Sequence, residues 1–203
     1  MRGDLGMTLC APSELGFEVR IGLAEGPMAR RLHTARRTDP LPRAVGLARR
    51  RTFPNIVDAT AGMGRDAFVL AHLGCPVIAI ERVPALAFLL QLAAAESAGI
   101  ELSVVTGDAV AWLRGRDQGE RPDVVYLDPM FGEHGKAQVK KEMQACRALA
   151  PADACDEREL LRAAREAALD RVVVKRAPGL APIADDVSHA VPGERVRFDV
   201  YLA

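Results

Sequence analysis

Short apolar runs alternate with helix-like segments along most of the chain. The apolar runs predict buried strands at residues 56–60, 77–81, 102–105, 124–127 and 172–174, and an alternating pattern predicts a last strand at 195–202. Helices are predicted at residues 65–73, 84–98, 136–149 and 157–169. Short strands separated by helices are typical of a mostly parallel sheet that is covered on both faces. The pattern therefore predicts a Rossmann-like α/β domain over residues 55–203.

The first 54 residues lack this alternation. Residues 15–23 can form a strand, and Pro40 and Pro42 predict a loop. The segment carries ten arginines against five acidic residues, and eight of these arginines lie between Arg30 and Arg51. An arginine-rich segment can bind phosphate groups or can form an ordinary solvated surface, and its sequence favours neither. We expect residues 1–54 to be a basic extension that packs on the core domain.

The composition excludes several classes of protein. A chain of 203 residues with 49% hydrophobic residues is expected to form one domain with a substantial core, not a disordered chain. The four cysteines lack the paired spacing of zinc ligands, so we expect neither a metal site nor a disulfide framework. With no long apolar run and no signal-peptide pattern, we expect a cytoplasmic protein that has no membrane partner.

A glycine turn follows the first predicted strand of the domain. Residues 62–67 match the G-x-G-x-x-A pattern of nucleotide sites, and Glu81 follows at the spacing of a ribose ligand. Asp58 and Asp66 flank the turn, and their charges would repel a pyrophosphate but not the ammonium and sulfonium of S-adenosylmethionine. We therefore expect S-adenosylmethionine as the cofactor. The turn glycines that let the backbone approach it are Gly62 and Gly64.

Carboxylates also stand at the ends of later strands. Glu81 is placed to accept hydrogen bonds from both ribose hydroxyls, and Asp108, with Ala109 beside it, to contact the adenine amine. Simpler explanations exist, because Asp108 can cap a short helix and Glu81 can pair with Arg82. Glycines and carboxylates at successive strand ends nevertheless favour a single cofactor cleft.

An acidic-proline-aromatic tetrad, residues 128–131, follows the fourth predicted strand. The Asp128 carboxylate and the Pro129 carbonyl can accept the two N–H bonds of an exocyclic amine, and Phe131 can stack on the base. Such a base must be flipped out of a duplex or met in a single strand. The tetrad therefore indicates methyl transfer to a planar nitrogen, with Met130 at the substrate. The alternative is a strand-end turn without chemistry.

Basic residues follow the tetrad and the fifth predicted strand. Lys140 and Lys141 lie on a predicted helix, and Lys175 and Arg176 end the strand on the same edge of the sheet. These four side chains are candidate phosphate contacts for a nucleic acid, although solvated lysines would give the same pattern.

At several places the sequence resembles the RsmJ family of small-subunit ribosomal RNA methyltransferases. The matching blocks are residues 58–71, 125–131, 139–143, 171–176 and 197–201. The resemblance implies a class I S-adenosylmethionine-dependent methyltransferase fold and methyl transfer to the N2 of a guanine in 16S ribosomal RNA. It also implies the cofactor contacts Arg65, Asp66, Glu81, Arg82, Asp108, Ala109 and Asp128.

The chain departs from the family pattern at two places near the site. Gly132 follows the tetrad where the family has a second proline, and Asp108-Ala109 replaces a pair of small hydroxyl residues. Other functions remain open on sequence alone. The protein can be an N-methyltransferase for another RNA, DNA or a protein glutamine, a non-catalytic RNA-binding assembly factor, or a nucleotide-linked oxidoreductase.

Overall fold

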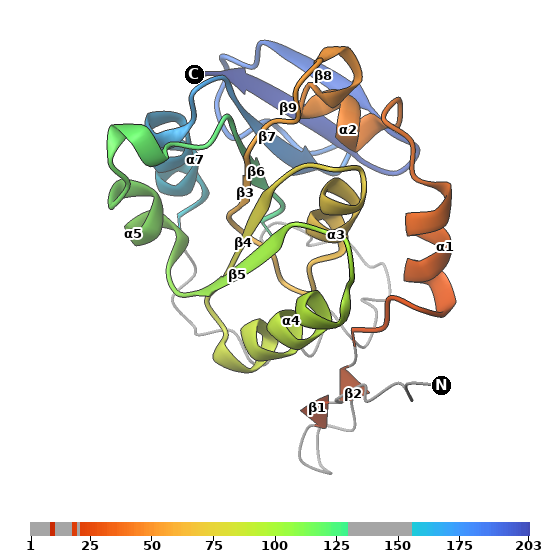
Figure 1. The fold of residues 1–203 in the computed structure, drawn as a ribbon. Helices are drawn as coiled ribbons and strands as arrows, with labels where there is room; N and C mark the ends of the chain where they lie inside the picture. Colours follow the sequence, from red (N-terminus) through yellow and green to blue (C-terminus); the bar gives the residue numbers. More distant parts are fainter. Residues whose placement is uncertain (1–8, 11–17, 20, 130–155) are drawn as a thin grey trace.

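A twisted sheet forms the centre of the fold in the computed structural model, which describes residues 9–10, 18–19, 21–129 and 156–203 (Figure 1). Within these residues the sheet has seven strands in the order β5-β4-β3-β6-β7-β9-β8. The strands are β3 (Ile56–Asp58), β4 (Val77–Glu81), β5 (Leu102–Thr106), β6 (Val124–Leu127), β7 (Arg171–Arg176), β8 (His189–Pro192) and β9 (Arg197–Leu202). The first five are parallel, and β9 pairs antiparallel with both β7 and β8.

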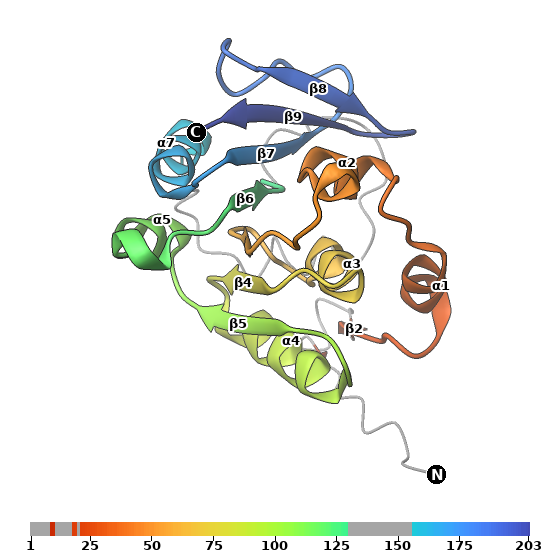
Figure 2. The same cartoon turned by 45° about the horizontal axis from the view of Figure 1, so that its top comes forward.

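Helices cover both faces of the sheet, as expected. On one face lie α1 (Gly26–Thr34), α2 (Pro40–Ala44), α3 (Arg65–His72) and α4 (Pro84–Glu96). On the other lie α5 (Ala109–Arg114) and α7 (Glu157–Ala167), and Figure 2 shows these two helices across the sheet from α1, α2 and α3. The shorter elements are η1 (Leu47–Arg49), η2 (Gln118–Glu120), β1 (Leu9–Cys10) and β2 (Glu18–Val19). The predicted α/β fold is confirmed. No helix in the described residues is long and apolar enough to cross a membrane.

The side chains of successive residues in a strand point to opposite faces of the sheet. In β6, Tyr126 packs in the core beneath α3, whereas Val125 and Leu127 pack in the core beneath α7. A strand that is buried on both faces needs apolar residues at every position, which explains the continuous apolar runs of the sequence.

The N-terminal segment contributes to the same core as the sheet. Leu41 and Leu47 are buried in one cluster with Ile56 of β3. We expected a loop around Pro40 and Pro42, and this prediction is wrong because α2 begins at Pro40. A proline is tolerated in the first turn of a helix, where its missing N–H has no intrahelical acceptor to lose.

Several arginines of this segment bind groups within the protein. The Arg37 guanidinium donates to the carbonyls of Leu47 and Arg50 at 2.8 and 2.9 Å and lies 5.3 Å from the centre of the Phe53 ring. Arg50 forms an ion pair with Asp170, at the amino end of β7. Part of the positive charge of residues 1–54 therefore fastens the segment to the domain.

Replacing Gly64 by alanine is expected to destabilise the fold more than replacing Gly99. The two glycines have similar φ angles, +69° and +81°. A Cβ on Gly64 would lie 2.3 Å from Leu90 Cδ1, whereas a Cβ on Gly99 would have no neighbouring atom within 4 Å. We expect losses in the free energy of unfolding of about 2–4 kcal/mol for Gly64→Ala and about 1 kcal/mol for Gly99→Ala. Urea unfolding measures both, and equal losses would contradict the packing argument.

Candidate functional site

A pocket opens at the carboxyl ends of the parallel strands. Its walls come from the ends of β3, β4, β5 and β6, from the first turn of α4 and from the start of α7. The residues are Ala59, Thr60, Ile80, Glu81, Arg82, Val83, Leu86, Gly107, Asp108, Ala109, Asp128, Pro129, Glu157 and Leu160. Six side chains that the sequence predicted for the site therefore meet here: Glu81, Arg82, Asp108, Ala109, Asp128 and Pro129.

Glu81 ties the glycine turn to the end of β4. Its Oε2 accepts the Gly62 N–H at 2.8 Å, and its Oε1 accepts the Val83 N–H at 2.7 Å. Burial raises the pKa of Glu81 above its usual value, and the two backbone N–H groups oppose that shift. Each carboxylate oxygen carries two lone pairs, so both can also accept a hydroxyl of a ligand. Glu81 can therefore hold the pocket wall together and bind a ligand hydroxyl at the same time.

Asp108 has the helix-capping role that its sequence position suggested. It is the N-cap of α5, and its Oδ1 accepts the Ala111 N–H at 2.8 Å. Asp108 also lines the pocket, so its role as a helix cap holds the carboxylate in place after β5 and leaves it in the site.

Thr60, which sequence reasoning did not identify as functional, ties the end of β3 to the end of β6. Its Oγ1 accepts the Asp128 N–H at 2.6 Å, and its own N–H donates to Asp58 Oδ1 at 3.1 Å. The signal in the sequence was a hydroxyl residue at a position where dinucleotide sites commonly have glycine. This contact fixes the backbone from which the tetrad begins.

Asp66 is a buried carboxylate behind the pocket wall. Its Oδ2 accepts the Tyr126 hydroxyl at 2.5 Å and Lys175 Nζ at 2.9 Å, and its Oδ1 pairs with Arg31. Burial alone would raise the pKa of Asp66, but the cations of Lys175 and Arg31 outweigh it and lower the pKa to about 2. Lys175 Nζ also donates to Asp128 Oδ2, at 2.7 Å. Burial would lower the pKa of Lys175, and the two carboxylates raise it instead.

Comparisons with known proteins agree with this geometry. A family model described as "Putative SAM-dependent methyltransferase" matches residues 7–203. A relative from Thioalkalivibrio sulfidiphilus, named ribosomal RNA small subunit methyltransferase J, is 43% identical over 209 residues, which cover 98% of this chain and 81% of the relative. A relative of the same name from Nitrosococcus oceani is 45% identical over 202 residues, covering 93% and 78%.

The chain belongs to the ribosomal RNA small subunit methyltransferase J family. The crystal structure of an S-adenosylmethionine-dependent methyltransferase from Neisseria gonorrhoeae is 34% identical to the chain, with a TM-score of 0.62 over 83% of this chain and 72% of that one. The expected RsmJ resemblance and the S-adenosylmethionine cofactor are confirmed.

Other residues that the sequence predicted for this methyltransferase lie beside the pocket and not in its walls. Asp58 is 2% exposed, and burial raises its pKa well above the usual value. Gly62 and Gly64 shape the turn, and Arg65 begins α3 on the surface. Cofactor contacts from this group, which also includes Asp66, stay predictions. Met130, Phe131, Lys140 and Lys141 lie outside the described residues.

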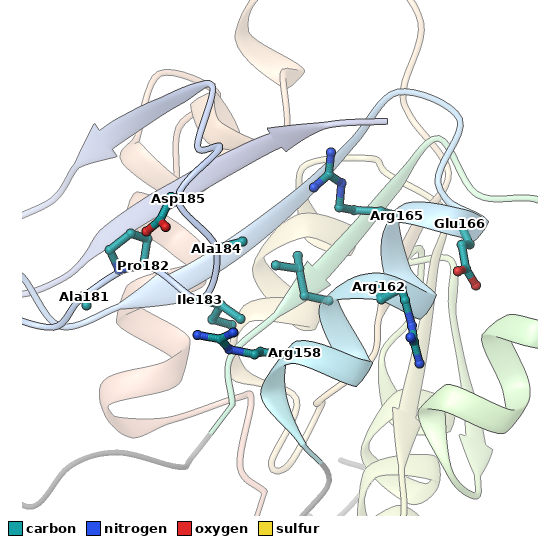
Figure 3. A pocket seen from close by; sticks show the side chains of 10 residues that line it. Arg158, Arg162, Arg165, Glu166, Ala181, Pro182, Ile183, Ala184 and Asp185 are labelled. Atoms are coloured by element: carbon teal, nitrogen blue, oxygen red, sulfur yellow. The ribbon is translucent and has the colours of Figure 1, made fainter.

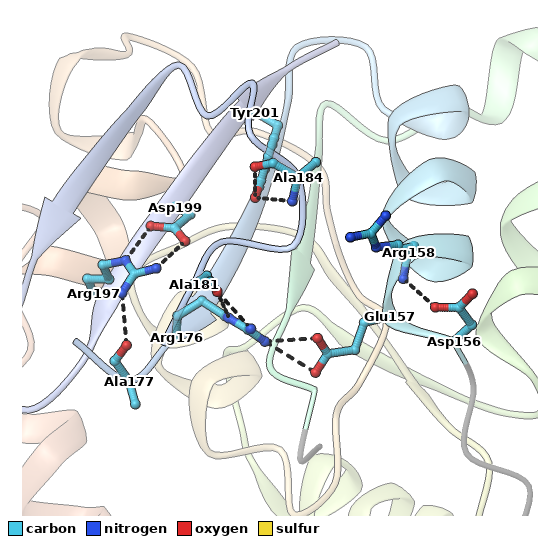
Figure 4. A network of polar contacts seen from close by, with 10 residues as sticks. All are labelled: Asp156, Glu157, Arg158, Arg176, Ala177, Ala181, Ala184, Arg197, Asp199 and Tyr201. Carbon is cyan, nitrogen blue, oxygen red and sulfur yellow. Dashed lines mark hydrogen bonds and ion pairs between the residues drawn. The ribbon is translucent and has the colours of Figure 1, made fainter. Parts of the chain in front are cut away.

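Lys175 and Arg176, expected as phosphate contacts, are engaged within the protein. Figure 4 shows the Arg176 guanidinium between Glu157 and the Ala181 carbonyl. Its Nη1 lies 3.0 Å from Glu157 Oε2, and its Nη2 lies 2.9 Å from the Ala181 carbonyl oxygen. The arginine thereby fastens the chain that follows β7 to the first turn of α7, at the edge of the pocket.

A second hollow, of about 580 Å³, lies between α7 and residues 181–185 (Figure 3). Arg158, Arg162 and Arg165 line it, together with Glu166 and Asp185. Its lining contains none of the residues that the sequence predicted for the site. The pocket at the strand ends is therefore the better candidate for the reaction.

The Asp66 carboxylate is expected to make the stability of the fold sensitive to acid. Because its pKa is held at about 2 against a usual 3.8, its contribution is complete above about pH 4 and is lost as the pH falls toward 2. The loss in unfolding free energy caused by Asp66→Asn should thus be smaller at pH 3 than at pH 6 by about 1 kcal/mol. Urea unfolding of the wild type and the variant at both pH values checks this, and an equal loss at pH 3 and at pH 6 would contradict it.

Proposed function

We propose that this protein transfers a methyl group from S-adenosylmethionine to the exocyclic N2 of a guanine in the 16S ribosomal RNA of the small subunit. The observation that carries the proposal is that Asp128 and Pro129 stand in one pocket with Glu81 and Asp108. Residues suited to hold an amine are thereby brought beside residues suited to hold the cofactor. The names of the family members supply the class of RNA.

The walls of the pocket suit a cofactor that carries positive charge. Four carboxylates line it, from Glu81, Asp108, Asp128 and Glu157, whereas Arg82 is the only cation among the described lining residues. A pyrophosphate would be repelled here, and the sulfonium and ammonium of S-adenosylmethionine would be attracted. This charge pattern disfavours a nucleotide-linked oxidoreductase. Apolar surface for the adenine comes from Ile80, Val83, Leu86 and Leu160.

Within the pocket we assign roles by chemistry. Glu81 would accept the ribose hydroxyls, and Asp108 with Ala109 would contact the adenine. When bound, S-adenosylmethionine would supply an activated methyl group to the amine nitrogen. The sulfur would keep the electrons of the broken bond, and the nitrogen would release a proton to water. The protein supplies alignment, which can account for several orders of magnitude in rate.

Asp128 and Pro129 would align the acceptor. The guanine amine is conjugated with its ring, so its lone pair is a weak nucleophile unless the N–H bonds are held in a fixed direction. The Asp128 carboxylate and the Pro129 carbonyl are acceptors at the pocket wall, where the Thr60 hydroxyl accepts the backbone N–H of Asp128. Phe131 would stack on the base, which has to leave the helical stack to reach the pocket.

Replacing Asp128 by alanine is expected to lower methyl transfer at least about 100-fold. The assay follows labelled methyl from S-adenosylmethionine into small subunits from cells that lack this gene, with the product nucleoside identified by mass spectrometry and mapped. Asp186→Ala is the control, because it removes an exposed carboxylate whose partner is Arg165. N2-methylguanosine at one site, lost in Asp128→Ala and retained in Asp186→Ala, is the expected result.

Different results would point to the other functions. Label in another RNA, in DNA or in protein glutamine would overturn the proposed substrate and keep the chemistry. RNA binding that Asp128→Ala leaves unchanged, with no turnover in the wild type, would favour a non-catalytic assembly factor.

Replacing Glu81 by glutamine is expected to weaken S-adenosylmethionine binding about tenfold or more. The amide removes a charged acceptor and turns an N–H₂ group toward the Gly62 or Val83 N–H. Isothermal titration measures the dissociation constant, and thermal melting without cofactor separates loss of binding from loss of folding. Tight binding of a nicotinamide dinucleotide by the wild type would contradict the charge argument for this pocket.

A further inference from the structure

Four charged side chains form a continuous chain from the surface of α1 to the pocket. Arg31 pairs with Asp66, Asp66 with Lys175 at 2.9 Å, and Lys175 with Asp128 at 2.7 Å. The signs alternate, so each charge has an opposite neighbour. The chain joins α1, α3, β7 and the end of β6, elements that are far apart in the sequence.

The lysine lies inside this chain and not on the surface. Its side chain is 25% exposed, compared with 7% for Asp66 on its inner side and 40% for Asp128 on its outer side. Its ammonium therefore bridges a fully buried carboxylate and one that faces the pocket. Tyr126 donates a hydrogen bond to the same Asp66 oxygen that Lys175 binds.

We propose that Lys175 is a positioning residue for Asp128, and that Asp66 anchors Lys175 from inside the fold. The proposal rests on the proposed function, because it assigns Asp128 to the amine of the acceptor. It changes the role that the sequence suggested for Lys175, from a phosphate contact to an internal support of the reacting site.

Two fixed points determine the direction of a side chain better than one. The backbone N–H of Asp128 is held by Thr60 Oγ1 at 2.6 Å, and its Oδ2 is held by Lys175 Nζ at 2.7 Å. A lysine normally has a mobile stem, but here its ammonium is also bound to a carboxylate of α3. The Asp128 carboxylate is thus oriented before an acceptor arrives, which is what alignment of a weak nucleophile requires.

The same contacts argue against a phosphate on Lys175. Two carboxylates, those of Asp66 and Asp128, already neutralise its charge. A phosphate could reach at most the third N–H of the ammonium, and it would face the negative charge of both carboxylates.

The two roles predict different kinetics for Lys175→Met, which removes the charge and keeps most of the stem. Positioning predicts that kcat falls about 10- to 100-fold, while KM for S-adenosylmethionine and for the small subunit changes by less than about threefold. A phosphate contact predicts that kcat is kept, that KM for the subunit rises, and that the salt dependence of binding loses about one unit of slope.

Further variants separate position from folding. Lys175→Arg, which keeps the charge, should recover part of kcat. The double variant Asp66→Asn with Lys175→Met also removes the buried carboxylate that loses its lysine partner in the single variant, so it should melt closer to the wild type than Lys175→Met and still have low kcat. The control is Arg165→Met, which breaks an exposed ion pair with Asp186 at 2.7 Å and should keep kcat within about twofold.

The pH profile adds a readout that a purely structural role would not move. Asp128 faces Lys175 of β7, and Asp66 of α3, Asp58 of β3 and Tyr126 of β6 lie around that contact. Without the lysine, only negative or neutral groups of this set remain near the carboxylate, so the acidic limb of the kcat profile should move to higher pH in Lys175→Met.

Wild-type kcat in folded Lys175→Met, or a rise in KM for the subunit as its only change, would overturn the positioning role and leave the proposed function standing. A wild-type enzyme with no methyl transfer to any acceptor would overturn the proposed function, and the role of Lys175 with it.

Discussion

The negative charge of Asp66, buried between α3 and the sheet, constrains much of the surrounding structure. A carboxylate in the interior is costly unless cations and donors surround it, so the fold has to bring Arg31, Lys175 and Tyr126 to one place. These partners come from the N-terminal segment and from two neighbouring strands. The packing of α1, the position of α3 and the direction of the lysine at the end of β7 are therefore linked through one group.

The pocket depends on a second constraint, which is that parallel strands end at the same edge. The strand ends alone would leave their loops independent of one another, and short side-chain contacts to backbone N–H groups join them. Glu81 binds the turn after β3, and Thr60 binds the chain after β6. Polar residues that line the pocket thus also hold its walls together, so one side chain can serve both the structure and the proposed binding of the cofactor.

Strands β3, β6 and the centre of β7 were predicted because they are buried and read as continuous apolar runs. The sequence missed β8, in which only Val191 is buried. It failed at Pro40, where a helix begins, because proline suits both a loop and a first helical turn. The direction of Lys175 could have been inferred from strand alternation. Val173 faces the core beneath α3, so Lys175, two residues later, faces it too, whereas Arg176 faces α7. The partners of Lys175 could not be inferred from the sequence, because only the tertiary fold brings Asp66 and Asp128 to it.

The charge of the pocket also bears on how an RNA could reach it. Carboxylates outnumber cations in the described walls even though Lys175 and Arg176 pair with Asp128 and Glu157 from behind them, so the pocket would not attract a phosphate backbone. A single base carries no such charge, and its amine is a donor that carboxylate and carbonyl oxygens can accept. Under the proposed function, the nucleotide therefore enters base-first while its phosphates stay outside. The acidic walls then favour a cationic cofactor and a neutral acceptor at the same time, which is the combination that direct methyl transfer requires.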